Sequence, residues 1–193
     1  MTVARYHPLL VALHWFLGAF LLLDLFLGTF VLKAIPNTSP DKLEALRAHM
    51  TGGFVILLLM SIRLAVRRTS ARPQAATAGH PLLDAIAKVS HVALYALVFL
   101  MVATGVATAL ISDAFAIVFA HSGQLPAAFN DLPTRVLHGY IAKALIGMIV
   151  LHVTAALYHQ YVRRDRLLRR MWFGRRFTAD VPAKPRPFSA LAK

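Results

Sequence analysis

Four long apolar stretches dominate the pattern of hydrophobic and polar positions along the chain. They run from Leu9 to Leu32, from about Leu46 to Val66, from Leu82 to Ile111, and from about Val136 to Val162. Each reaches or exceeds the ~20 residues that an α-helix needs to cross the hydrocarbon core of a bilayer. The pattern therefore predicts an all-α integral membrane protein, built as a four-helix bundle.

Polar segments with turn-forming residues separate these stretches. They are KAIPNTSPDKLEA at 33–45, RRTSARPQAATAGHP at 67–81 and SDAFAIVFAHSGQLPAAFNDLP at 112–133. The third contains an apolar piece, Ala114 to Ala120, which is too short to span a bilayer and is expected to form an interfacial helix. No small-residue cleavage site follows the first apolar stretch at signal-peptide distance, so we expect that stretch to be retained as a helix.

Composition and charge orient this bundle. The chain of 193 residues is 58% hydrophobic with a mean hydropathy of +0.62, well above a typical soluble domain. Most of its 21 Lys and Arg residues lie in the N-terminus, in the middle connection with its flanks, and after the fourth stretch. By the positive-inside rule, both termini are expected in the cytoplasm.

Residues 1–171 are thus expected to form the transmembrane domain, and residues 172–193 a basic, proline-rich cytoplasmic tail. The proline-rich part after Phe177 is expected to be loosely ordered. The run RRDRLLRR at 163–170 directly follows a spanning stretch, so we interpret it as a topology signal that contacts anionic membrane lipid and not as a nucleic-acid site. The absence of cysteine excludes disulfides, thiolate metal sites and haem attached covalently through a C-x-x-C-H motif.

Histidines within the spans carry the candidate chemistry. His138 and His152 are 14 residues apart, which on a helix is a rise of about 21 Å and a return to within about 40° of the same face. His14 lies in the first stretch at the depth of His152, and His49 lies near the start of the second at the depth of His138. The pattern predicts two imidazole pairs, one near each side of the membrane.

Paired imidazoles from facing helices suit the two axial positions of a haem iron. A porphyrin pressed against a helix also needs small residues beside its ligand. The residue four positions after each paired histidine is small: Gly18, Gly53, Ala142 and Ala156. The corresponding residues after His91 and His159 are Tyr95 and Arg163. We therefore expect iron ligation by the four paired histidines, with Gly18 and Gly53 lining the cofactor.

Alternatives remain for these side chains. The histidines could simply pack the helices, since small residues are common where membrane helices meet. Zinc is disfavoured because its ligands would have to converge on one point. His91 is the main rival ligand at the inner site, or it could bind a propionate or a quinone; His159 could do the same. His7, His80 and His121 are expected in ordinary solvated roles.

With these residues in place, the chain resembles the bacterial cytochrome b561 family of four-helix di-haem membrane proteins, from about Tyr6 to Met171. The resemblance rests on LHW at 13–15, RAHMTGG at 47–53, KVSHVALYAL at 88–97, LHGYIA at 137–142 and LHVTAALYHQYVRRDRLLRRM at 151–171. It implies a multi-pass protein of the bacterial inner membrane with two haems b. It further implies that His14 and His152 ligate one haem, and that His49 and His138 ligate the other.

Within the family the chain is most similar to the superoxide oxidases, which implies electron transfer from superoxide outside the membrane to ubiquinone near the cytoplasmic side. Arg47, Arg135 and Lys143 lie near the outer histidines and could attract a small anion, or could be ordinary interfacial anchors. The candidate quinone contacts, chosen by depth and polarity, are Trp15, His91, Tyr158 and His159. Asp24 lies within the first span and is a functional candidate by that fact alone, with no role assigned.

Two other functions fit the same residues. The chain could be a haem b subunit that links the quinone pool to a partner dehydrogenase or a periplasmic cytochrome. It could also be a membrane scaffold without redox chemistry, in which the histidines only pack helices. A colourless purified protein would identify the scaffold, and a co-purifying subunit would identify the linking role.

Overall fold

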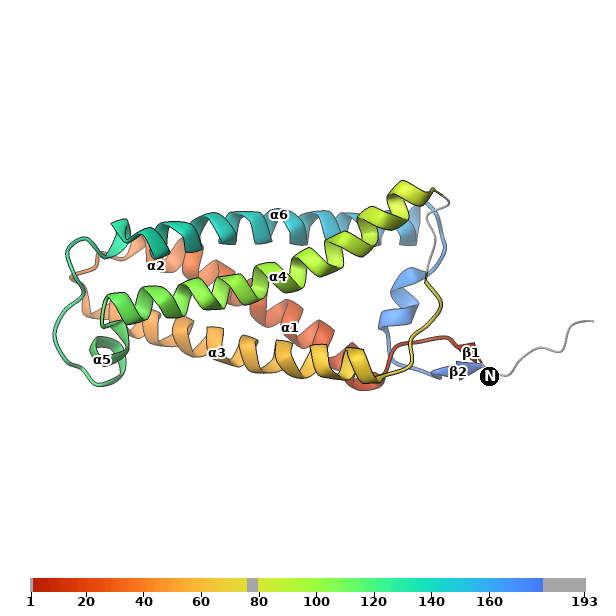
Figure 1. Ribbon diagram of the computed structural model, residues 1–193, viewed down its shortest axis with the longest axis horizontal. Helices are drawn as coiled ribbons and strands as arrows, with labels where there is room; N and C mark the ends of the chain where they lie inside the picture. Colours follow the sequence, from red (N-terminus) through yellow and green to blue (C-terminus); the bar gives the residue numbers. More distant parts are fainter. Residues whose placement is uncertain (1, 76–79, 179–193) are drawn as a thin grey trace, which may run out of the picture.

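The computed structural model describes residues 2–75 and 80–178. Its long helices are α1 (Pro8–Phe26), α3 (Pro40–Thr69), α4 (Pro81–Ile111) and α6 (Pro133–Tyr161), arranged as an elongated bundle (Figure 1). α1 continues through a π-helical turn, η1 (Leu27–Val31), into the short α2 (Leu32–Ala34). In the described part of the chain, four helices are long and apolar enough to cross a membrane. The prediction of an all-α membrane four-helix bundle is confirmed.

Each long helix begins with proline in its first turn, where the missing N–H has no intrahelical partner to lose. Side chains just before three of these helices accept a hydrogen bond from the first turn. Ser39 accepts from the amide of Asp41, and the Nδ1 atoms of His7 and His80 accept from amides two residues later, at 3.2 Å each. Two histidines expected to be merely solvated therefore act as N-caps.

Short elements complete the chain. The helix expected at 114–120 is present as α5 (Ala114–Phe119). Two 3₁₀ turns are η2 (Phe129–Asp131) and η3 (Leu167–Met171). Two short strands, β1 (Thr2–Val3) and β2 (Phe177–Thr178), pair antiparallel.

Both described ends of the chain lie at the same end of the bundle, because β1 pairs with β2 there (Figure 1). We call this the inner end, and the opposite end, which carries α5, the outer end. Residues 2 and 178, the ends of the described chain, thus lie at one end of the bundle, which fits the expectation that both termini are on one side of the membrane. That this side faces the cytoplasm remains a prediction from charge.

The first residues of the predicted tail, 172–178, are held against the bundle. The guanidinium of Arg5 donates to the carbonyls of Trp172 and Phe173, and β2 adds backbone pairing. The rest of the predicted tail, 179–193, lies outside the described residues.

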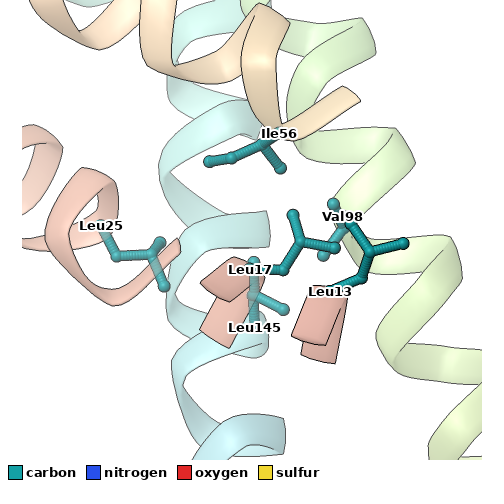
Figure 2. Packing of buried hydrophobic residues seen from close by; sticks show 6 residues of the cluster. All are labelled: Leu13, Leu17, Leu25, Ile56, Val98 and Leu145. Carbon is teal, nitrogen blue, oxygen red and sulfur yellow. The ribbon is translucent and has the colours of Figure 1, made fainter. Parts of the chain in front are cut away.

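The bundle consists of two helix pairs. α1 packs mainly on α3, and α4 mainly on α6, with fewer contacts between the pairs. A central cluster of buried aliphatic side chains joins all four helices at mid-depth: Leu13, Leu17, Leu25, Ile56, Val98 and Leu145 (Figure 2). Leu145, which is 0% exposed, lies midway between His138 and His152 along α6. The core therefore separates the two predicted imidazole pairs.

A second buried cluster at the outer end packs α5 onto the bundle. Its members are Leu32, Leu46, Ala109, Ala114, Val118 and Phe129. In contrast, large apolar side chains such as Leu23, Leu58 and Leu110 are more than half exposed along the spans. Such faces suit contact with lipid, where apolar exposure costs nothing.

Candidate functional site

The structure brings four histidines together as two pairs, each bridging the two helix pairs. The ring centroids of His14 on α1 and His152 on α6 are 6.2 Å apart, with an interplanar angle of 75°. Those of His49 on α3 and His138 on α6 are 6.1 Å apart, at 88°. These are the partners expected from depth along the sequence. One pair lies toward the inner end and the other toward the outer end.

The centroid separations match the spacing of two ligands on one iron. An imidazole nitrogen lies about 1 Å from its ring centroid and about 2 Å from a metal that it binds, so axial imidazoles have centroids about 6 Å apart. Within the described ranges, no group of three or more His, Asp or Glu side chains could hold a metal ion. The arrangement fits two-ligand axial coordination and not a tetrahedral zinc site.

A hydrogen bond to Asp24 selects the tautomer of His49. The Nδ1 atom of His49 lies 3.1 Å from Oδ1 of Asp24. An ionised carboxylate only accepts, so the Nδ1 atom carries the proton and donates it. This leaves the Nε2 atom of His49 with a free lone pair, the form that a metal ligand requires.

His138 is held in the same tautomer by Thr104. The hydroxyl of Thr104 donates its single proton to the carbonyl of Leu100, at 2.8 Å, and its oxygen lies 3.1 Å from the Nδ1 atom of His138. Because that proton is already used, the oxygen accepts from Nδ1–H of His138. Both outer imidazoles therefore keep Nε2 available for coordination.

Glycines on neighbouring helices make room for the two outer imidazoles. A Cβ atom at Gly28 would lie 3.1 Å from Cε1 of His49, and one at Gly105 would lie 3.3 Å from Cε1 of His138. Sequence reasoning missed both, because it searched only the helix that carries each ligand. The sequence did contain a signal for them. Glycine inside a helix lowers its stability, so a glycine within a span, at the depth of a predicted ligand on another helix, indicates that a bulky group packs closely there.

The predicted small neighbours lie on the open side of their histidines. Nothing lies within 4 Å of a Cβ atom placed at Gly18 or Gly53. Gly53 lines a cavity of about 630 Å³ at the outer site, together with His49, His138 and Ala142. A cavity of this size is in the range of cofactor pockets. The residues present fit a flat group inserted between the outer imidazoles.

The outer cavity is strongly cationic. Its basic lining residues are Lys33, Lys42, Arg135 and Lys143. The ammonium group of Lys42 donates to the carbonyls of Leu32 and Ile35. For Arg135, by contrast, no hydrogen bond or ion pair is found within residues 2–75 and 80–178. A half-buried, unpartnered guanidinium is suited to an anionic group such as a propionate or a small anion.

The three predicted outer cations differ in their surroundings. Arg135 and Lys143 line the cavity, and the Lys143 ammonium lies 5.2 Å from the Tyr140 ring centroid. Arg47 is not among the cavity-lining residues. Its guanidinium donates to the carbonyl of Val118 at 2.7 and 3.1 Å and pairs with Glu44. Arg47 thus ties α5 to α3.

The inner pair is surrounded differently. In the described part of the chain, no hydrogen bond is found to the side chain of His14 or His152. The half-buried guanidinium of Arg63 acts electrostatically on both and donates to the hydroxyl of Tyr95. The charged group nearest the inner pair is therefore a cation, whereas an acidic side chain contacts the outer pair.

His91 forms a third imidazole at the inner end. Its ring centroid lies 5.5 Å from that of His152, and its Nδ1 atom donates to the carbonyl of Ala87 at 2.6 Å. The 5.5 Å separation is shorter than the spacing expected of two axial ligands. The separation of His14 and His152 matches that spacing, so geometry favours His14 over its rival.

Two of the predicted quinone contacts hold the C-terminal segment instead. The indole Nε1–H of Trp15 donates to the carbonyl of Met171 at 2.7 Å, and its ring packs against Trp172. His159 pairs through Nδ1 with Asp165 at 2.5 Å, and its ring contacts that of Tyr158. These contacts anchor the chain after α6.

Asp165 lies outside the spans. Burial opposes its ionisation, but the hydrogen bond with His159 and the charge of that residue outweigh this effect and hold the pKa of the Asp165 carboxyl below its usual value. The pair therefore favours an ionised Asp165 at neutral pH.

Comparison with known proteins agrees with this geometry. The model of the family described as prokaryotic cytochrome b561 matches residues 5–174, which is most of the chain. The chain belongs to the prokaryotic cytochrome b561 family. Members of this family are haem b electron-transfer proteins, and the chain is accordingly a multi-pass haem b protein of the bacterial inner membrane.

Two curated relatives support the family assignment. The chain is 27% identical over 177 residues to "Cytochrome b561 homolog 2" of Escherichia coli (strain K12), covering 88% of this chain and 92% of that protein. It is also 27% identical over 173 residues to "Probable superoxide oxidase CybB" of Yersinia pestis, covering 86% of this chain and 95% of that protein. The likeness to both extends over nearly the whole length of each protein.

Proposed function

We propose that this b561-family protein binds two haems b and transfers electrons from superoxide, at the outer end, to ubiquinone near the inner end. His14 and His152 hold the inner haem, and His49 and His138 hold the outer one. Each bound haem supplies one-electron redox chemistry. One observation carries the proposal: two pairs of imidazoles lie toward opposite ends of one bundle. The ring centroids within each pair are 6.2 Å and 6.1 Å apart.

Superoxide as the donor is supported by the charge of the outer cavity. Arg135 and Lys143 present positive charge beside His138, and Arg135 lacks a partner within the described residues. Fixed cations raise the local concentration and capture rate of a small anion. The similarity to a probable superoxide oxidase points to the same substrate. Two superoxide anions each give up one electron and leave as dioxygen.

Ubiquinone as the acceptor is supported by the position of His91. Its side chain is exposed beside His152, and its Nδ1–H is held by the carbonyl of Ala87, which leaves Nε2 free. A lipid-soluble quinone can reach such a group from the bilayer. The quinone takes up two electrons and two protons to become ubiquinol, which balances the oxidation of two superoxide anions.

An optical experiment on detergent-purified protein tests this proposal. The oxidised protein is exposed to a controlled flux of superoxide, and its haem spectrum is followed with and without added ubiquinone. We expect a b-type spectrum with two haems per chain, rapid reduction by superoxide, and reoxidation by quinone. Arg135→Ala should slow reduction about tenfold and weaken its dependence on ionic strength.

Arg72→Ala is the matched control, because it removes one arginine charge at the inner end, where Arg72 donates to the carbonyl of Arg67. It should leave reduction by superoxide unchanged. A two-haem spectrum that does not respond to superoxide would reject superoxide as the donor and favour the alternative of a subunit serving a partner dehydrogenase or periplasmic cytochrome. A colourless protein would reject haem binding itself.

A further inference from the structure

We propose that Asp24 is the positioning residue of the outer haem site, and that its negative charge lowers the reduction potential of the haem held by His49 and His138. This inference rests on the proposed function, since it requires a haem at that pair. Asp24 lies within the span formed by α1, with its side chain 14% exposed and that of His49 19% exposed. An ionisable group at this depth is costly and needs a specific partner.

His49 is that partner. The carboxylate accepts Nδ1–H at 3.1 Å, which orients the ring and leaves Nε2 free, in an imidazole whose centroid lies 6.1 Å from that of His138. A carboxylate on the distal nitrogen makes a histidine ligand more basic. A more basic ligand, with a nearby negative charge, stabilises the ferric over the ferrous state and so lowers the potential.

The surrounding backbone accommodates this contact. A Cβ atom at Gly52 would lie only 2.7 Å from Oδ1 of Asp24, so any larger residue would displace the carboxylate. Gly28, which packs against His49, falls in the π-helical turn Leu27–Val31 that begins three residues after Asp24. Inserted π turns occur frequently at functional sites because they shift the register of one helical face. Gly52, Gly28 and the π-helical turn therefore all lie around the hydrogen bond between Asp24 and His49.

The other ligands lack such a group. The recorded hydrogen-bond partners of His138 are neutral: the hydroxyl of Thr104 and the backbone of Met101. Within the described residues, no carboxylate contacts His14 or His152, and the charge acting on them is the guanidinium of Arg63. The outer cavity also contains cations, but none of them is bonded to a ligand imidazole. Asp24 therefore changes one of the two haems selectively.

This selectivity favours movement of electrons away from the outer site. A lowered potential there makes loss of one electron, from ferrous to ferric iron, more favourable for the outer haem than it would be without the carboxylate. An electron that superoxide gives to the outer haem therefore passes more readily to the inner haem, the site beside Arg63. The direction agrees with donation at the outer end and acceptance at the inner end.

Redox titration of the purified holoprotein tests this role, with the potential as a readout separate from activity. Asp24→Asn keeps an oxygen that can accept from His49 but removes the charge. We expect both haems to be retained and the outer component to become at least tenfold easier to reduce, about 59 mV for a one-electron couple. The inner component should not move. A His138→Ala variant, lacking the outer haem, identifies which component is which.

Asp131→Asn is the matched control, since it removes an exposed carboxylate in η2 at the same end of the bundle. Equal outer potentials in Asp24→Asn and Asp131→Asn would overturn the inference. If Asp24→Asn loses the outer haem, the outer potential of Gly52→Ala is compared with that of Asp131→Asn in its place, because the added methyl group displaces the Asp24 carboxylate. Equal potentials would again overturn the inference. A wild-type titration showing no second haem would instead refute the proposed function.

Discussion

The outer and inner imidazole pairs have almost the same ring separation but are held in different ways. At the outer pair, Asp24 and Thr104 hydrogen-bond the Nδ1 atoms of His49 and His138, and glycines pack against the imidazole rings. At the inner pair, no described side chain bonds His14 or His152.

The inner pair has other neighbours. A cation, Arg63, and a third imidazole, His91, lie beside it, and the chain after α6 folds back toward it through Trp15. The outer site is thus organised by hydrogen bonds before any cofactor binds, whereas the orientation of the inner imidazoles depends on packing. Sites that are fixed by such supporting bonds tolerate less change around their ligands.

The largest expected effect distinguishes the two candidate partners of His152. Replacing His14 with Ala should remove the inner haem, leaving about half of the wild-type haem per chain, because one axial ligand is lost. The measurement is haem content per chain, combined with the reduced-minus-oxidised spectrum. His91→Ala is the matched substitution and should retain both haems. The opposite result would make His91 the inner ligand.

A smaller effect should follow from crowding the outer imidazole. Gly105→Val adds bulk where even a Cβ atom would lie 3.3 Å from His138. Overpacking of this kind costs roughly 1–3 kcal/mol, so we expect reduced occupancy of the outer haem and a lower thermal unfolding temperature. Gly147→Val, also in a span but with nothing within 4 Å of its Cβ position, is the control. Equal losses in both variants would argue against a specific close approach at Gly105.

The smallest effect concerns the anchor at the inner end. The pKa of Asp165 is lowered in the folded protein, so its carboxylate contributes stability at pH values above its ordinary pKa of 3.8 and loses that contribution as the pH falls through the folded value. Asp165→Asn should therefore speed hydrogen exchange in residues 163–171 at pH 7, by a few-fold at most, because the pair is partly exposed. The difference should shrink as the pH falls below 3.8 and vanish once the pH lies below the folded pKa of Asp165. A difference that persists there would exclude ionisation of Asp165 as its cause.

Much of the architecture could be predicted from residue pattern alone. Helix length and hydropathy are local properties, so the existence of the four spans and of the short helix at Ala114–Phe119 could be predicted. The start of the second span was wrong by six residues: α3 begins at Pro40 inside the expected loop, because Ser39 caps it and its first turns are polar. The pairing of His14 with His152, and of His49 with His138, also followed from helical rise, because depth in a bundle is proportional to position along each helix.

The chain's own periodicity could not reveal which side chains support those histidines. The Asp24–His49 bond and the approach of Gly28 depend on the rotation of α1 against α3, which the π turn shifts. Likewise, Arg47 was expected at the outer site because of its depth along α3. Its guanidinium instead donates to the carbonyl of Val118 in α5. The C-terminal segment is ordered for a similar reason, through donors contributed by Arg5 and Trp15.

The sequence by itself thus determined the number of spans, their depth register and the two levels at which imidazoles meet. These follow from the rise per residue and from the cost of burying polar groups in lipid. Only the tertiary structure decided that an acidic side chain contacts the outer pair while a cation lies beside the inner one. That asymmetry arises from how the helices rotate and approach one another, which is a property of their packing and not of any single helix.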